Sequence, residues 1–434
     1  MFEFASGLFP LCRSITGSGL RETLRRIQQE IPITIHEVPS GTPVLDWTIP
    51  EEWNIRDAWV ANARGQRVVD FREHNLHVVS YSVPVRARMS FEELRPHLHS
   101  LPEHPDWIPY RTSYYQRDWG FCLPHRRLAQ LDGGEYDVRI DATLAPGALT
   151  YGELFLRGRS EEEFLFSAHC CHPSLANDNL SGVAVAVALA RLLSERNLRH
   201  SFRFLFVPGT IGALTWLAHN EERLHRIRHG LVLTCVGNEG PVTYKKSRRG
   251  GALVDQVAQE VLRESGDAHR VLEFFPYGYD ERQYCSPGFN LPVGCFMRAQ
   301  HGTFPQYHTS ADNLDFITPA ALMDSLEKLL AIVEGIENGE ELRTAKAGRP
   351  ENTTVPHESP RFLNLKPRGE PQLGRYGIYE ALGGDIMPAL WVLNLSDGTH
   401  SLAGIAVRSG LPFDKLARAA DILKTRGLLK EVEP

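Results

Sequence analysis

The chain has 434 residues, of which 42% are hydrophobic and 23% charged, and its net charge is -6. The length predicts two or three domains, and the composition is typical of a soluble globular protein. The negative net charge does not favour binding to nucleic acid or to a membrane surface, both of which need an excess of Lys and Arg. No apolar run is long enough to span a membrane.

The first residues and the cysteines both bear on the cellular compartment. The N-terminal segment MFEFASGLFPLCRSITGSG has an acidic Glu3 and no basic region, and Ser6, Gly7 and Pro10 interrupt its apolar residues. This pattern predicts no secretory signal. The seven cysteines are scattered and odd in number, which is not typical of a disulfide framework. We therefore expect reduced thiols and a cytoplasmic location.

The first predicted elements are a helix and a β-rich unit. Residues 18–30, SGLRETLRRIQQE, have the pattern of a capped amphipathic helix. Between about 33 and 148 the chain is rich in aromatic residues, prolines and short alternating runs such as 76–85 and 135–144. Turn residues separate these runs, which predicts short strands. We place this inserted β-rich domain at residues 41–148.

From about residue 149, strand-like and helix-like segments alternate. Strands are expected at 163–168, 202–208, 230–236, 271–275 and 293–297, and helices at about 180–197, 211–228, 251–265 and 318–338. Such alternation predicts an α/β domain with a largely parallel sheet and helices on both faces. The helix at 18–30 is assigned to the same domain, which then comprises residues 1–40 and 149–345.

The C-terminal part predicts a linker followed by a small helical domain. Residues 339–372 are rich in Glu, Gly, Pro and Arg and lack periodicity, which is typical of a linker. Two helical patterns flank the turn at residues 409–412, and the second closes on Gly427, which predicts a helix-turn-helix. We place a winged-helix domain at 350–434. Its ten basic and ten acidic residues balance, which favours packing or dimerisation over DNA binding.

The stretch SAHCCHPSLANDNLSG at residues 167–182 carries the densest set of metal-binding residue types. If the strand before it continues to residue 172, His169 and Cys171 lie on one face and Cys170 and His172 on the other. Four adjacent residues cannot surround one zinc ion, because tetrahedral sites need spacers. His172 then lies at the entrance of a loop that brings Asp178 to the start of the next helix.

Polar residues follow several of the predicted strands at the edge where ligands bind in open α/β sheets. They are His172, Asp178, Asn238, Glu239, Asp280, Glu281 and His308. His and Asp side chains from separate strand ends suit a catalytic zinc with three protein ligands and one open position. The alternative is that they are ordinary loop residues and helix caps.

Several of these segments resemble a known family. ANDNLSG at 176–182 resembles the motif around the bridging aspartate of M28-type zinc aminopeptidases, and YHTSADNLD at 307–315 resembles the segment with their last histidine ligand. Nearly the whole chain resembles an uncharacterised aminopeptidase-like family, DUF4910, with an inserted β-rich domain of the DUF2172 type and a C-terminal winged helix. The resemblance implies this fold, with a mixed sheet of the zinc-peptidase type, and a zinc ion held by His172, Asp178 and His308.

The chain departs from the M28 pattern at three positions. M28 enzymes have a Glu-Glu pair after the next strand, as general base and second-metal ligand, where this chain has Gly209 and Thr210. The aspartate expected after GLVLTCVG is Asn238, a neutral and weaker ligand. Glycine moves no proton, and threonine is a poor substitute for a carboxylate ligand. Because two of the usual second-metal carboxylates are missing, we expect one zinc ion per chain.

The remaining candidate residues have predicted roles beside the zinc ion. Glu281 or Glu239 would shuttle the proton to the leaving group, and Arg282 would bind a substrate carboxylate, with Asp280 and Asn238 as further substrate contacts. For each of these charges, a solvated loop or a structural ion pair is an equal alternative. His169 is expected to orient the zinc ligands rather than to bind zinc. The basic run KKSRRG at 245–250 is either an anion site or a solvated turn.

The combined prediction is a zinc-dependent hydrolase that cleaves an amide with a zinc-activated water. Its substrate would be a peptide or a small aminoacyl or N-acyl biosynthetic intermediate. The expected partners are this substrate and, as one option, a second copy of the chain, but no nucleic acid and no membrane. The alternative class is a degenerate peptidase-like binding module without turnover, which the departures at Gly209 and Asn238 favour.

Overall fold

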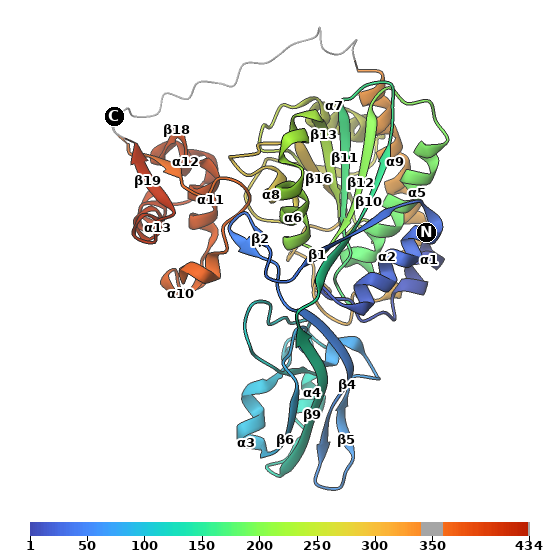
Figure 1. Cartoon of the computed structure of the whole chain (residues 1–434), viewed down its shortest axis with the longest axis vertical. Coiled ribbons are helices and arrows are strands. Elements are labelled where there is room, and N and C mark those ends of the chain that lie inside the picture. Colours follow the sequence, from blue (N-terminus) through green and yellow to red (C-terminus); the bar gives the residue numbers. More distant parts are fainter. Residues whose placement is uncertain (340–358, 433–434) are drawn as a thin grey trace.

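An eight-stranded mixed sheet forms the centre of the protein in the computed structural model, which describes residues 1–339 and 359–432 (Figure 1). The strands follow the order β1-β10-β12-β11-β13-β16-β14-β15. Their bounds are β1 Thr34–Pro39, β10 Ala148–Leu156, β11 Glu163–His169, β12 Ser201–Val207, β13 Ile227–Leu233, β14 Val242–Lys245, β15 His269–Leu272 and β16 Val293–Met297. The predicted domain boundaries at 345 and 350, and most of the predicted linker, lie outside the described residues.

The four central strands are parallel, and antiparallel strands flank them. β12, β11, β13 and β16 pair in parallel, whereas β10 is antiparallel to β12, and β14 is antiparallel to β16. All seven residues of β11 and of β12 are buried, as expected for strands that are covered on both faces. The predicted α/β class with a mixed sheet is confirmed.

Helices cover both faces of this sheet, and each face has its own hydrophobic core. Phe164 and Phe166 of β11 pack toward one core, and Leu165 between them packs toward the other. The first core is covered by α1 Phe2–Leu8, α2 Ser18–Glu30, α5 Gly182–Ser194, α7 Leu253–Glu264 and α9 Pro319–Glu337. The second is covered by α6 Ile211–His219 and α8 Glu281–Tyr284, on the opposite side in Figure 1.

Several elements of the central domain differ from the sequence prediction, which did not include α1, β1 or β10. The helix expected at 211–228 ends at His219, where the Asn220 side chain donates to the Trp216 carbonyl at 2.8 Å and terminates it; a short 3-10 helix, Glu221–Arg226, follows. Strand β14 was not predicted, because it lies next to the basic run and its short sequence VTYK has no clear alternation.

The part of the chain between β1 and β10 in sequence forms a second sheet (Figure 1). Its four antiparallel strands follow the order β5-β4-β9-β6, with bounds β4 Glu52–Asn62, β5 Arg67–Asp70, β6 Val85–Ser90 and β9 Glu135–Ala145. β9 runs almost directly into β10, so the two sheets share one continuous stretch of chain. A loop of this unit reaches the central domain, where the Tyr110 N–H donates to the His308 carbonyl at 2.7 Å.

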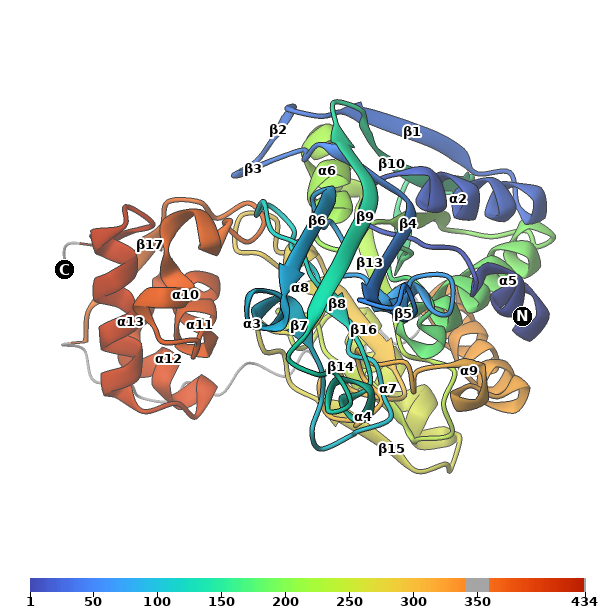
Figure 2. The same cartoon turned by 90° about the horizontal axis from the view of Figure 1, so that it is seen from below.

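The C-terminal unit is a winged helix to one side of the central sheet (Figures 1 and 2). It contains β17 Arg361–Asn364, α10 Ile378–Ala381, α11 Met387–Leu395, β18 Asp397–Ser401, α12 Leu402–Ser409, α13 Phe413–Thr425 and β19 Leu429–Val432. Leu390, Ile405 and Leu416 form part of its own core. Gly410 follows the last residue of α12 and starts the turn between the two helices. Its φ of +68° is a conformation that favours glycine.

The winged helix is attached to the central domain through an arginine of the basic run. Arg248 donates to the side chain and the carbonyl of Asn394, at 3.0 and 3.1 Å, and to Asp397 at 2.8 Å. The segment after β17 is also held, since the Gly288 N–H donates to the Pro367 carbonyl at 2.8 Å. Within the described ranges, no helix is both long and apolar enough to cross a membrane.

We expect Arg203→Ala to destabilise the central sheet strongly. Arg203 of β12 is 4% exposed and binds both oxygens of the buried Glu163, at 2.6 and 3.0 Å, as well as Glu153. Removing the cation leaves buried carboxylates without a partner, which costs about 3–5 kcal/mol of unfolding free energy. Guanidinium unfolding followed by circular dichroism measures this loss.

The matched control is Arg191→Ala. Arg191 forms an ion pair with Glu30 in which its side chain is 61% exposed, so its loss costs less than about 1 kcal/mol. Equal losses for the two variants would contradict the assignment of Arg203 as a structural buried ion.

Candidate functional site

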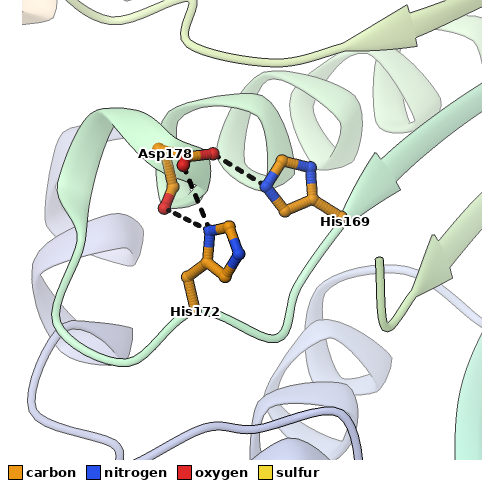
Figure 3. Close-up of side chains that lie close together, drawn as sticks. All are labelled: His169, His172 and Asp178. Atoms are coloured by element: carbon orange, nitrogen blue, oxygen red, sulfur yellow. Dashed lines mark hydrogen bonds and ion pairs between the residues drawn. The ribbon is translucent and has the colours of Figure 1, made fainter. Parts of the chain in front are cut away.

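The candidate site is built around Asp178, in the loop between β11 and α5. β11 ends at His169 rather than at residue 172. The strict alternation that would turn His169 away from His172 therefore does not apply, and this expectation is corrected. His169 Nε2 lies 2.8 Å from Asp178 Oδ1, and His172 Nδ1 lies 3.2 Å from Asp178 Oδ2 (Figure 3).

A third imidazole reaches the same carboxylate from the loop after β16. His308 Nε2 lies 3.1 Å from Asp178 Oδ2, and the rings of His172 and His308 are 5.1 Å apart. Both Asp178 Oδ2 and His308 Nε2 are buried and lack a well-aligned hydrogen-bond partner among the described residues. The structure thus brings the predicted trio of His172, Asp178 and His308 together.

The electrostatics of the cluster favour an ionised Asp178 and neutral imidazoles at His169 and His308. Burial opposes the charge on Asp178, but the imidazoles of His172, His169 and His308 outweigh it and hold its pKa well below the usual value. Burial lowers the pKa of His169 to about 3, although Asp178 opposes this shift. Burial likewise lowers the pKa of His308. These are the protonation states that metal binding requires.

Two residues without a predicted role hold the cluster in place. The Asn179 side-chain amide donates to His169 Nδ1 at 3.3 Å, which leaves His169 Nε2 to donate to Asp178. Asp312 accepts from the N–H groups of Asn177 and Asp178 at 2.6 and 2.9 Å. Asp312 lies four residues after His308, so the segment YHTSADNLD supplies both a candidate ligand and the carboxylate that orients the other ligand loop.

The donor set fits a zinc ion. Zinc prefers imidazole nitrogens and carboxylate oxygens, and the orphaned atoms of Asp178 and His308 are donors of these types that face each other. Two groups of ligand-type side chains have donor atoms within 4.8 Å of one another, namely His169, His172 and Asp178, and Asp178, Cys235 and His301. Both groups share Asp178.

The structure does not bring the two predicted proton-shuttle residues to the trio. Glu281 is fully buried and pairs with Lys245 Nζ at 2.5 Å. Glu239 is exposed, and no hydrogen bond or ion pair joins it to another residue in the described part of the chain. The structural alternative for Glu281, a buried ion pair, is the one observed.

The three predicted substrate contacts lie in different surroundings. Asn238 is buried and accepts from the Asn177 side chain at 3.2 Å, next to the Asp178 loop. Arg282 forms an ion pair with Glu370 at 3.1 Å. Asp280 accepts from the Thr210 N–H at 2.6 Å, and its second oxygen is buried with no hydrogen-bond partner among residues 1–339 and 359–432. Burial raises the pKa of the Asp280 carboxyl to about 7, against the opposing hydrogen bond from Thr210.

A cavity of about 600 Å³ opens beside His172. All three units of the protein contribute to its walls. The central domain contributes Cys171, His172, Gly209, Thr210, Tyr279 and Arg282, the β-rich unit Trp47, Tyr114, Tyr115 and Gln116, and the C-terminal segment Glu370, Gln372, Arg375, Tyr379 and Glu380. A small molecule can therefore reach His172 while it contacts aromatic rings and charged groups of all three units.

Sequence reasoning also missed Tyr279. Its ring stacks on His169 with 3.5 Å between centroids, and its hydroxyl lies 3.3 Å from His172 Nε2. The signal in the sequence was its place directly before the segment DERQ with its three charged residues, and those charges drew attention instead.

The sheet and the site at its carboxyl edge define an aminopeptidase-like fold. The structure is similar to a zinc aminopeptidase from Bacillus subtilis, with a TM-score of 0.56 and 14% identity over 77% of this chain and 93% of that one. It is also similar to an M28 peptidase precursor from Shewanella amazonensis, with a TM-score of 0.54 and 13% identity over 78% and 93%. The chain belongs to the family described as domain of unknown function DUF4910, which matches residues 2–339 and thus includes the inserted unit.

Residues 361–431 match a winged helix-turn-helix family, which confirms that predicted C-terminal fold. A Clostridium acetobutylicum protein is 48% identical over the whole of this chain and 96% of its own length; its name proposes a polysaccharide biosynthesis protein with an aminopeptidase-like domain. A crystal structure from the same organism, named as a proposed peptidase, is 47% identical, with a TM-score of 0.77 over 99% of this chain and 96% of that one.

We expect Asp280→Asn to remove a pH dependence of folding stability. An aspartate in the unfolded chain titrates near 3.9, whereas the folded pKa of Asp280 is raised to about 7, so folding takes up a proton between these values. The wild type therefore loses stability as the pH rises through this window. Relative to the variant, the loss between about pH 5 and pH 8 is about 2–3 kcal/mol. Urea unfolding at both pH values measures it.

Asparagine keeps the oxygen that accepts from Thr210 but has no titrating proton. Asp421→Asn, at an exposed position of α13, serves as the control and should behave as the wild type. The same pH dependence in Asp280→Asn and the wild type would show that Asp280 is ionised in the folded protein.

Proposed function

We propose that this protein is a zinc-dependent hydrolase that cleaves an amide, with His172, Asp178 and His308 as the zinc ligands. The observation that carries the proposal is the convergence of these side chains beside a cavity, with two buried ligand-type atoms that lack a well-aligned hydrogen-bond partner within the described part of the chain. The similarity in fold to zinc aminopeptidases supports the same reaction class.

A zinc ion held by this trio would supply a Lewis acid and lower the pKa of a water molecule to about 7. The protein's own residues provide the geometry. His169 donates to Asp178 Oδ1, and Asp312 fixes the backbone of the Asp178 loop. The carboxylates of a second zinc site are absent at Thr210 and Asn238, and we therefore propose one zinc ion per chain.

We propose a small biosynthetic amide as the substrate. The cavity is bounded by the β-rich unit and by the segment around Glu370, so a long polypeptide would have to displace these walls. Arg282 lines the cavity and is the candidate contact for an anionic substrate group, while Asp280 and Asn238 lie behind its surface. The name of the Clostridium acetobutylicum relative supports an intermediate of polysaccharide biosynthesis, such as an N-acylated amino sugar.

The second candidate is a degenerate binding module. It is favoured by the departures from the M28 pattern at Gly209, which lacks the general-base carboxylate, and at Asn238. Such a protein would bind its ligand in the same cavity without metal-dependent turnover. Zinc content and turnover therefore discriminate between the two functions.

Elemental analysis of protein purified without chelator should find about one zinc ion per chain. Asp178→Asn and His308→Ala should reduce this content to near zero, because each removes one of three protein ligands. The control is His225→Ala, at an exposed position of the 3-10 helix after α6. Two zinc ions per chain would implicate Cys235 and His301, against our proposal of one, and undiminished zinc in His308→Ala would reject the trio.

Turnover is tested with a panel of aminoacyl and N-acyl amides that includes N-acylated amino sugars. The wild type should release product, and His308→Ala should lower the rate at least about a hundredfold, in keeping with a catalytic metal. Equal rates in the two proteins would contradict the metal mechanism. No release by zinc-loaded wild type across the panel would favour the binding module.

We propose that the winged helix walls the cavity rather than binding DNA, and that the protein is cytoplasmic, with its seven cysteines as free thiols. Lys415 and Lys424 of α13 are paired with Asp385 and Glu431, which removes part of the positive charge that phosphate binding needs. Fluorescence anisotropy with a labelled duplex should therefore detect no binding at low salt. Tight binding that weakens steeply with added salt would contradict this assignment.

A further inference from the structure

We propose that the Tyr279 hydroxyl is a catalytic group that occupies the place left free by the glycine at position 209 and donates a hydrogen bond to the reacting carbonyl oxygen. This inference rests on the proposed amide hydrolase function. It concerns a residue for which neither the sequence pattern nor the similarity in fold suggests a role.

The hydroxyl and a side chain at position 209 exclude each other. Gly209 lies just beyond the end of β12, and a Cβ atom added to it would lie 1.9 Å from Tyr279 Oη and 2.5 Å from Tyr279 Cζ. Any larger residue at 209 must displace the phenol. The hydroxyl therefore fills the space into which the general-base carboxylate of M28 enzymes would begin to project.

The hydroxyl contacts His172 at the ring nitrogen opposite to Nδ1, the nitrogen that faces Asp178. It lies 3.3 Å from His172 Nε2 and 3.8 Å from Cys171 Sγ, and Tyr279 lines the cavity together with both residues. Its ring packs flat against His169, with 22° between the planes. A carbonyl group that approaches the trio from the cavity thus meets this hydroxyl.

A buried ion pair fixes the backbone that presents Tyr279. The Tyr279 N–H lies 3.2 and 3.0 Å from the two oxygens of Glu281, and Lys245 Nζ donates to the Tyr277 carbonyl at 2.7 Å. Gly278 between them has a φ of +149°, and a Cβ atom there would lie 2.2 Å from Glu281 Oε1. Lys245 and Glu281 are therefore positioning residues for Tyr279. This assigns a role to one charged residue of the KKSRRG segment and one of the DERQ segment.

The proposed role requires no proton transfer by the phenol. When water adds to an amide, the carbonyl oxygen gains negative charge, and a preorganised donor stabilises that charge more than it stabilises the substrate. A tyrosine hydroxyl is protonated at neutral pH and is both a donor and an acceptor. It can therefore stabilise the negative charge that develops on the carbonyl oxygen. The proton for the leaving amine comes from the water molecule that adds to the amide.

The decisive variant is Tyr279→Phe in the zinc-loaded full-length protein, because it removes the hydroxyl and keeps the ring on His169. We expect kcat to fall about a hundred- to a thousandfold, with KM nearly unchanged, as for removal of one oxyanion donor, and zinc content to stay at the wild-type value. The control is Tyr136→Phe, whose hydroxyl binds Asp132 in the β-rich unit. Unchanged kcat in Tyr279→Phe would overturn the proposal.

Gly209→Ala provides an independent test, because its methyl group must displace the hydroxyl. It should lower kcat by a similar factor, and the double variant should be no slower than either single variant, since both remove the same interaction. Losses that multiply in the double variant would mean that Gly209 and Tyr279 act separately, and would also overturn the proposal.

A binding measurement decides the question without turnover. Acetohydroxamate carries an anionic oxygen that the hydroxyl should contact, so calorimetric titration of zinc-loaded protein should give a Kd about ten- to a hundredfold weaker for Tyr279→Phe. An equal Kd for variant and wild type, or no binding to zinc-loaded wild type, would refute the role of Tyr279. Failure of the hydrolase proposal has a different signature, namely wild-type protein that retains no zinc.

Discussion

The buried charge of Asp178 is the constraint on which the rest of the site depends. A carboxylate that is fully removed from water is costly unless it is paired and hydrogen-bonded. Asp178 meets this condition with imidazoles from two loops, while Asp312 binds the backbone N–H of Asp178 itself. Because these groups follow β11 and β16, the carboxylate is stable only when the central sheet has brought both strand ends into register.

The same constraint explains why the β-rich unit lies where it does. His308 has a φ of +55°, a conformation that few non-glycine residues adopt, and its backbone carbonyl is held by the Tyr110 N–H. The Ser310 hydroxyl of the same loop accepts from the Ile108 N–H at 2.9 Å. The inserted unit thus fixes the conformation of a loop that carries a candidate ligand, in addition to forming one wall of the cavity.

The sequence predicted the parts of the site that depend on local pattern. Apolar runs with regular spacing located β11, β12, β13 and β16, and the rule that ligands lie beyond strand ends pointed to His172, Asp178 and His308. It could not predict contacts between distant segments. The pairing of Lys245 with Glu281, and the exact end of β11, depend on the folded neighbourhood, so Glu281 received a chemical role and Tyr279 received none.

The geometry around Gly209 bears on the choice between an enzyme and a binding module. In the sequence, the glycine at this position indicates only that the general-base carboxylate of M28 enzymes is missing. In the structure the vacated space is filled by a polar group, and a fully buried ion pair holds that group against His172. Burying Lys245 and Glu281 costs free energy that an apolar pair of similar volume would avoid. A module that only binds its ligand does not need such a buried ion pair. A catalyst that requires a rigid hydrogen-bond donor beside its metal does need it.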